Sequence, residues 1–316
     1  MAGAPIASAS SWPRALGDRP KVTFWESASF TAAHAVASGL LLGLGLSGLY
    51  RFARLFGTLE WLINFKRRRR FGAALEEALG RRPTPTERRR HTREFFMRTR
   101  CDKLFYLILD RIPRKRATRL LDIGNQPVLD EAVGRGRGVY VALSHHGPQH
   151  VIAMLFALRG YKTAGVRDRN EGAIRRFVQQ RLDQRYPDLP KARMLFADSY
   201  PREIYRCLQD GYVLGSAMDV HRPRDPQQTT EEVVIFGQTR RFPSGPLRIA
   251  LRCRCPALQA FIIPQRDFRY RLEIVGTLLD PDRIDNEPAA VAQAMRTYAA
   301  NVERQVRAQP SLLSRI

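Results

Sequence analysis

Residues 139–150 read VYVALSHHGPQH, an apolar run followed at once by three of the chain's six histidines and a Gly-Pro pair. Five consecutive apolar residues are typical of a buried strand, and Gly-Pro ends regular structure. The apolar residues 151–158 that follow favour a helix. The sequence therefore predicts a strand-to-helix turn with His145 where the strand ends.

Strand-like and helix-like segments alternate on both sides of this turn, which is the pattern of an α/β fold. Further strands are expected at residues 119–123, 162–166, 193–197, 212–218, 233–236, 257–263 and 270–275. Helices are expected at residues 73–79, 171–186, 201–209, 246–251 and 289–307. Gly80 should end the first of these helices, and residues 83–87, PTPTE, resemble the start of another.

The N-terminal part of the chain has the composition of a membrane anchor. Residues 31–50 carry no charged side chain and approach the roughly 20 residues that a helix needs to cross a bilayer. An aromatic segment and the basic run at 66–70, KRRRR, follow, as in an interfacial helix held on anionic lipid. Residues 1–30 do not resemble a cleavable signal peptide. We therefore expect an uncleaved anchor, and a buried helix with a solvated basic tail remains the alternative.

Two regions follow from this composition: residues 1–70 as membrane anchor and interfacial helix, and residues 71–316 as an α/β catalytic domain. Positive charge beside the anchor places that domain in the cytoplasm.

The chain carries 53 Lys and Arg against 30 Asp and Glu, a formal charge of +23. Such an excess favours an anionic partner: nucleic acid, membrane lipid or an acidic carrier protein. No helix-turn-helix, zinc finger or aromatic-plus-basic RNA motif is recognisable. The four cysteines show no zinc-ligand spacing. The basic run beside the apolar segment therefore favours lipid over nucleic acid.

His145 has the position of a general base. A histidine at a strand exit can take a proton from an alcohol while nearby N–H groups hold the developing negative charge. A carboxylate usually orients such a histidine, but the fifth residue after His145 is His150, which offers no compensating charge. Asp219, at the end of another predicted strand, could orient His145 instead, and a structural cap is the other role open to it.

The same histidines allow a metal site. His146 and His150 are spaced i, i+4 and would share one face of a helix, with Asp219 and His221 as further ligands. Gly147 and the following proline make a regular helix between the histidines doubtful. A metal-dependent hydrolase and purely structural histidines both remain alternatives.

The order of these motifs resembles the bacterial lipid A biosynthesis (lauroyl/myristoyl) acyltransferase family, within the lysophospholipid acyltransferase superfamily. Residues 144–150 are similar to that family's HX4D/E motif at His145 and Gly147, with His150 in the acid position. Three later segments also resemble parts of that family. Residues 166–170, VRDRN, resemble its arginine-asparagine segment, and residues 211–219 resemble its strand ending in aspartate. Residues 236–250 resemble its Phe-Gly turn before a Gly-Pro helix. The resemblance spans residues 35–310, and the family's tryptophan-rich C-terminus is absent.

The resemblance implies a mixed central sheet flanked by helices, as in glycerolipid acyltransferases, preceded by a membrane-anchoring helix. It implies acyl transfer from acyl carrier protein or coenzyme A to a glycolipid or phospholipid acceptor, on the cytoplasmic face of the bacterial inner membrane, without a cofactor. His145 would be the base, with His150 and Asp219 beside it; a degenerate member that only binds lipid is the alternative that His150 suggests. Substrate contacts are expected from Ser144, His146, Gly147, Arg167, Arg169, Asn170, Gly237 and Arg240.

Overall fold

The computed structural model describes residues 24–167, 173–187, 193–196, 202–219 and 229–313. Seven strands form one mixed sheet in the order β1-β9-β8-β2-β5-β3-β4. Those from β8 to β4 run parallel, whereas β9 is antiparallel to β8 and parallel to β1. The strands are β1 (Leu121–Gly124), β2 (Val139–Leu143), β3 (Thr163–Arg167), β4 (Arg193–Phe196), β5 (Val213–Ala217), β8 (Ala257–Pro264) and β9 (Tyr270–Leu279). The expected α/β class with a mixed central sheet is confirmed.

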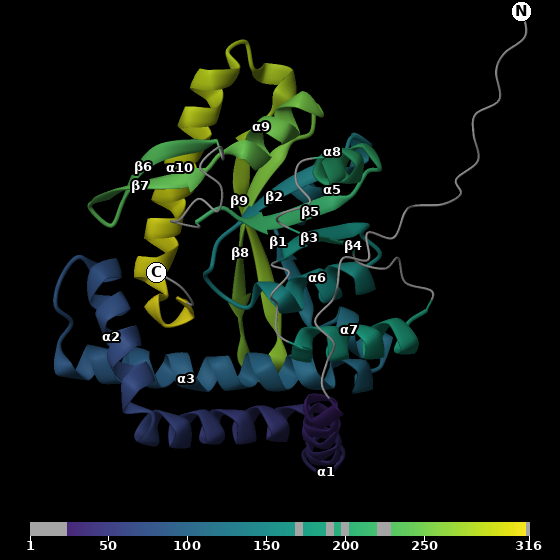
Figure 1. The fold of residues 1–316 in the computed structure, drawn as a ribbon, viewed down its shortest axis with the longest axis vertical. Helices are drawn as coiled ribbons and strands as arrows, with labels where there is room; N and C mark the ends of the chain where they lie inside the picture. The colour runs from purple at the N-terminus through teal and green to yellow at the C-terminus, as the bar shows by residue number, and fades with distance from the viewer. Residues whose placement is uncertain (1–23, 168–172, 188–192, 197–201, 220–228, 314–316) are drawn as a thin grey trace, which may run out of the picture.

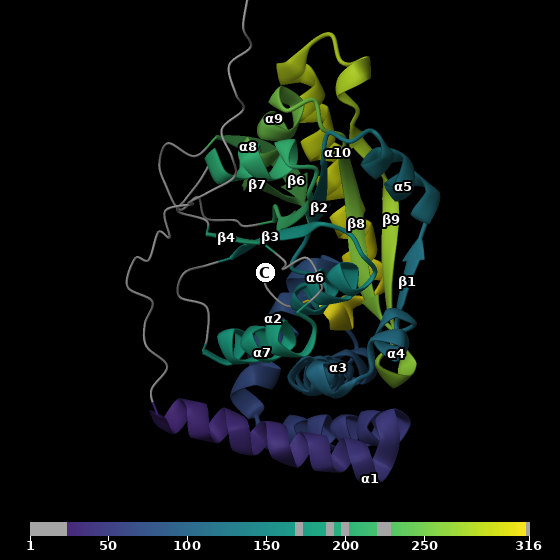
Figure 2. The ribbon, with the colours of Figure 1, turned by 90° about the vertical axis from the view of Figure 1, so that its right-hand side faces the viewer.

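Helices cover both faces of this sheet (Figures 1 and 2). Every residue of β2 is buried, as expected for a strand with helices on both sides. Val139, Val141 and Leu143 pack in one core cluster and Tyr140 and Ala142 in the other. The helices of this part of the fold are α4 (Arg114–Thr118), α5 (Gln126–Gly134), α6 (Gln149–Leu158), α7 (Ala173–Arg185), α8 (Arg202–Gln209), α9 (Gly245–Arg252) and α10 (Glu287–Ala308). The hairpin of β6 (Thr230–Ile235) and β7 (Gln238–Pro243) lies outside the main sheet.

Three long helices form the N-terminal part: α1 (Phe24–Ile63), α2 (Phe65–Leu79) and α3 (Pro85–Ile108). Gly80 ends α2 in the left-handed conformation, and Thr84 and Glu87 form a capping box at the start of α3, because each side chain satisfies a backbone N–H that the first turn leaves unpaired. Both boundaries agree with the expectation from the sequence.

The apolar segment 31–50 lies within α1 and holds a sharp bend. Gly45 has φ 64° and ψ −178°, outside the helical region, and divides α1 into a first leg (residues 24–44) and a second leg (residues 46–63). Figure 1 shows the first leg end-on at the base of the molecule and the second leg running beneath α3, while Figure 2 shows the first leg along its length. Within the described residues, α1 is the one helix long and apolar enough to cross a membrane.

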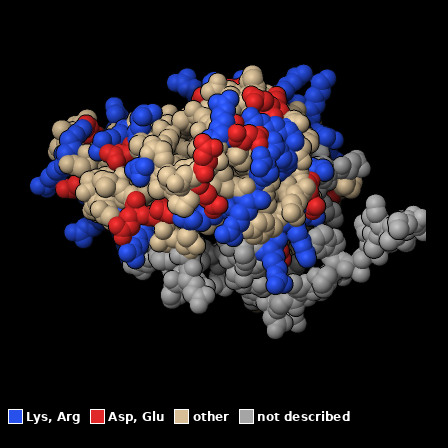
Figure 3. Space-filling view, turned by 90° about the horizontal axis from the view of Figure 1, so that it is seen from above, with Lys and Arg blue, Asp and Glu red and all other residues tan. Residues whose placement is uncertain are grey.

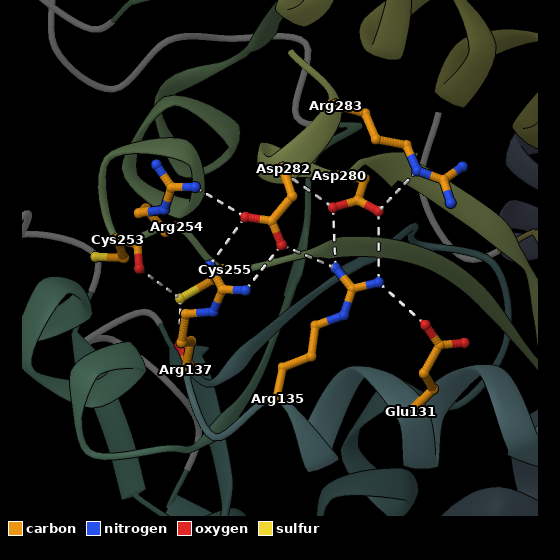
Figure 4. A network of polar contacts seen from close by, with 9 residues as sticks. All are labelled: Glu131, Arg135, Arg137, Cys253, Arg254, Cys255, Asp280, Asp282 and Arg283. Carbon is orange, nitrogen blue, oxygen red and sulfur yellow. Dashed lines mark hydrogen bonds and ion pairs between the residues drawn. The ribbon is translucent and has the colours of Figure 1, made fainter.

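An ion-pair network closes the edge of the sheet at which β2 begins (Figure 4). Arg135, after α5, bonds to Asp280, after β9, at 2.9 Å, and Arg137 bonds to Asp282 at 2.8 Å. Arg254 reaches the same Asp282 carboxylate at 2.8 Å. The guanidinium groups of Arg137 and Arg254 lower the pKa of Asp282 to about 2. The network thus ties three loops together at the edge opposite the histidine motif.

Candidate active site

Two neighbouring parallel strands bring His145 and Asp219 together. Strands β2 and β5 pair from Val139 with Val213 to Leu143 with Ala217, so their carboxyl ends lie at the same edge of the sheet. His145 and Asp219 each follow their strand by two residues. The strand pairing therefore brings together two residues that are 74 positions apart in the sequence.

The contact between these two residues has two points. The Asp219 Oδ1 atom lies 2.7 Å from His145 Nδ1, and Oδ2 accepts the backbone N–H of His145 at 2.7 Å. The side chains keep 22% and 13% of their surface exposed, so both are screened from bulk water while still reachable. The carboxylate that is missing from the histidine motif is therefore supplied by the adjacent strand.

A 3-10 turn near the C-terminus, η4 (Pro310–Leu312), packs against the histidine motif. The Gly147 N–H donates to the Leu312 carbonyl at 2.9 Å, and His146 Nε2 lies 3.0 Å from the Gln309 carbonyl oxygen. His146 is buried, and this burial lowers its pKa to about 4. The structure thus places His146 in contact with the protein's own C-terminal segment, as a neutral donor.

Gly147 meets a backbone requirement. Its φ is +88°, a conformation that L-residues with a side chain rarely adopt. A Cβ at this position would collide with the carbonyl oxygen of Ile262. Before it, Ser144 is buried, and its hydroxyl has no hydrogen-bond partner among the described residues. The side-chain amide of Gln149 donates to the Ser144 carbonyl, and this hydrogen bond joins the two ends of the loop at residues 144–149.

The remaining predicted substrate residues lie apart from this pair or outside the described part of the chain. Gly237 forms the β6–β7 turn, where Phe236 also has a positive φ, and Arg240 is buried against the carboxylate of Glu77 in α2. The Arg240 guanidinium is therefore engaged in an internal ion pair. Arg167 ends β3 and His150 lies in the first turn of α6, but their side chains are not described. Arg169, Asn170 and His221 lie outside the described residues altogether.

The proposed metal alternative finds no support in the described side chains. Among them, no group of three or more His, Cys, Asp and Glu residues could hold a metal ion. Of its suggested ligands, His146 directs Nε2 to a backbone carbonyl and Asp219 is held by His145.

The family model of the bacterial lipid A biosynthesis acyltransferases matches residues 30–312. The chain belongs to this family. It is therefore an acyltransferase, as the motif order indicated. Among solved structures, the 1-acyl-sn-glycerophosphate (LPA) acyltransferase PlsC from Thermotoga maritima is similar at 16% identity and a TM-score of 0.37, covering 84% of this chain and 100% of that chain. A search of curated proteins found no match.

Tyr298, in α10, is a residue of this acyltransferase that the sequence did not single out. Its hydroxyl donates to the Leu143 carbonyl at 2.7 Å, and the same carbonyl accepts the Met218 N–H at 3.1 Å. Leu143 ends β2 and Met218 directly precedes Asp219, so the fully buried Tyr298 fixes the two strand ends that carry the pair. The sequence alone predicts this helix from its hydrophobic periodicity, and on such a helix a tyrosine cannot be distinguished from an ordinary core residue.

Burial of neutral His146 should make the stability of the acyltransferase depend on pH. Its pKa falls from an ordinary 6.5 to about 4 in the folded chain, so between these values only the unfolded chain binds the proton. The stability that this group contributes is therefore present above pH 6.5 and is lost as the pH falls towards 4. When the pH is lowered from 7.5 to 5, the melting temperature of the native chain should decrease more than the melting temperature of His146→Gln. Because the two proteins share all other titrating groups, equal decreases would show that His146 is not held neutral by burial.

Proposed function

We propose that this acyltransferase moves a fatty acyl group from an acyl thioester to a hydroxyl or amine of a lipid acceptor, with His145 as the general base and Asp219 as its carboxylate partner. The observation that carries the proposal is the two-point contact of Asp219 with the ring and the backbone of His145, at 2.7 Å in both places. Such a contact fixes the orientation of the ring.

The proton path follows from which ring nitrogen is engaged. His145 Nδ1–H donates to Asp219, so Nε2 takes the proton of the acceptor hydroxyl as its oxygen attacks the thioester carbonyl carbon. The tetrahedral intermediate then collapses with cleavage of the carbon–sulfur bond, and the proton on Nε2 passes to the leaving thiolate. Asp219 stabilises the imidazolium between these steps, and no covalent enzyme intermediate is needed.

Substrate recognition is proposed for the segment that follows β3. Strand β3 pairs in parallel with β5, so Arg167, which ends β3, lies at the same sheet edge as Asp219, one strand away. Arg169 and Asn170 follow it in the sequence. Guanidinium groups pair bidentately with phosphate, which suits an acyl carrier or coenzyme A thioester and a phosphorylated glycolipid. The family's place in lipid A biosynthesis supports a lipid A precursor as the acceptor.

We also place the enzyme on the cytoplasmic face of the bacterial inner membrane. Support comes from the uncharged stretch at 31–50 and the basic run at 66–70 directly after α1, because the negative surface of the cytoplasmic leaflet attracts basic segments next to an apolar one. A catalytically degenerate lipid-binding member is the second candidate, suggested by His150 in the acid position.

Asp219→Asn separates these two candidates. The substitution keeps the size of the side chain but removes the charge that stabilises the imidazolium, so kcat should fall by roughly a hundredfold to ten-thousandfold. His150→Ala should change kcat by less than about tenfold. His150 lies in α6, after the histidine loop, and the carboxylate that contacts His145 belongs to Asp219, which follows β5. Transfer of radiolabelled acyl chains from acyl carrier protein to a lipid A precursor by the purified full chain measures both. Unchanged transfer by Asp219→Asn would remove Asp219 from the mechanism, and unchanged transfer by His145→Ala would remove the base.

Tyr298→Phe tests whether the strand ends must be fixed. Loss of the hydroxyl frees the Leu143 carbonyl from one of its two donors, so the spacing of His145 and Asp219 loosens and kcat should fall on the order of tenfold at unchanged KM. Tyr140→Phe is the matched control, because it removes a buried tyrosine hydroxyl that bonds to the side chain of Ser216 at 2.7 Å. Similar decreases of melting temperature are expected for both variants. An equal loss of kcat in the two would show that only packing is at stake.

A further inference from the structure

The base of the molecule is an apolar surface, which we call the apolar floor: the outward side chains of residues 25–65. Of the fourteen large apolar side chains that are exposed among the described residues, eleven belong to it. Leu42 is 88% exposed, and Trp25, Leu55, Leu59 and Ile63 also face outward. Such a concentration of exposed large apolar side chains on one part of the chain is unusual for a soluble monomer and marks a binding face.

The inner side of the first leg is held to the domain by buried polar contacts. His34 is buried in α1, and its Nε2 lies 2.9 Å from Oδ1 of Asp110, which lies in the 3-10 turn directly after α3. Arg181 of α7 donates to the other oxygen of Asp110 at 3.0 Å. Removing His34 from this cluster would leave a buried carboxylate with one partner fewer, which is unfavourable. The first leg is therefore fixed along the domain.

In the second leg as well, the charged side chains that form ion pairs are directed towards the rest of the protein. Arg54 bonds to Glu94 of α3 at 3.2 Å, and Glu60 accepts from Arg67 at 3.0 Å and from Arg100 at 2.6 Å. Outward, apart from Arg51, the second leg presents apolar side chains such as Leu55 and Leu59. Both legs thus have one side bonded to the protein and one apolar side exposed.

The arrangement of the two legs decides how such a surface can meet a bilayer. Both legs lie in the lowest layer of the molecule, one seen end-on and the other lengthwise in Figure 1, and Figure 2 shows the first leg along this same layer. A helix that crosses a bilayer must run through it, and either leg could do so only by leaving the domain. Docking flat keeps every inner contact and immerses the apolar side chains of both legs.

We propose that the apolar floor inserts flat into one leaflet of an anionic bilayer, and that α1 does not cross the membrane. This inference rests on the proposed membrane association and specifies its geometry. The charges beside the floor fit anionic head groups: Lys66, Arg69 and Arg70 in α2 are exposed, as are Arg114 and Lys115 in α4, and none has an ion-pair partner among the described residues. Figure 2 shows α4 just above α1, whereas the opposite face mixes basic and acidic side chains (Figure 3).

Charged substitutions in the floor test the surface. The double variant Leu42→Asp with Leu59→Asp places one carboxylate on each leg. It should bind vesicles of phosphatidylethanolamine and phosphatidylglycerol at least about tenfold more weakly than the native chain, because two exposed apolar side chains that would enter the leaflet are replaced by charged ones. Val234→Asp is the matched control, since Val234 is 66% exposed but lies on the β6–β7 hairpin. Flotation of the full chains measures binding. A double variant that floats like the native chain would overturn the assignment of the floor.

The position of the N-terminus tests the topology. In sealed inside-out membrane vesicles, an epitope tag at the N-terminus of the full chain should be digested by added protease, because flat docking leaves both ends of α1 on the side of the catalytic domain. Protection of the tag would show that α1 crosses, and would overturn flat docking while leaving the proposed acyl transfer intact. A native chain that fails to float at all would instead remove the membrane association itself. Acyl transfer in detergent micelles, which needs no docking, should be the same for the native chain and the double variant.

Discussion

The parallel pairing of β2 with β5 is the interaction on which the candidate site depends. It places two strand ends side by side and so converts a separation of 74 residues into a contact of 2.7 Å. The pairing is reinforced where it matters most: the Leu143 carbonyl accepts from both the Met218 N–H and the Tyr298 hydroxyl. An imidazole and a carboxylate need alignment to a fraction of an ångström to share a proton usefully, and buried backbone bonds are the stiffest way to provide it.

The histidine loop itself is held from behind by the end of the chain. Gly147 donates to Leu312, and His146 contacts the Gln309 carbonyl, so two of the three residues after Ser144 are bonded to the C-terminal turn. His145 directly precedes these two residues and directs its side chain to Asp219. Adjacent residues of this motif thus have different roles: His146 and Gly147 hold the loop in place, and the side chain of His145 stays partly exposed to solvent.

Much of the fold could be predicted from the sequence because its elements are locally encoded. The apolar run at 139–143, Gly80 after its helix and the capping sequence at 83–87 all specify structure within a few residues, and all appear as expected. Strand order is different, since it depends on contacts between distant segments. Spacing alone therefore drew attention to His150 as the orienting residue and left Asp219 with two possible roles, although the strand that precedes Asp219 was predicted correctly. The turn of β6 and β7 likewise gave no sign that Arg240 would pair with Glu77.

The bend in α1 could not be foreseen for a related reason. Four glycines, at positions 39, 43, 45 and 48, lie in the apolar stretch, and nothing local distinguishes the one that breaks the helix. Gly45 adopts a positive φ at little cost because it has no Cβ, and the contacts on either side select it: His34 with Asp110 before the bend, and Arg54 with Glu94 after it. A straight helix could satisfy only one of these pairs along the surface of the domain. The same two polar contacts that hold the legs in place therefore leave their apolar sides in one layer, so the shape of the apolar floor follows from contacts on its inner side.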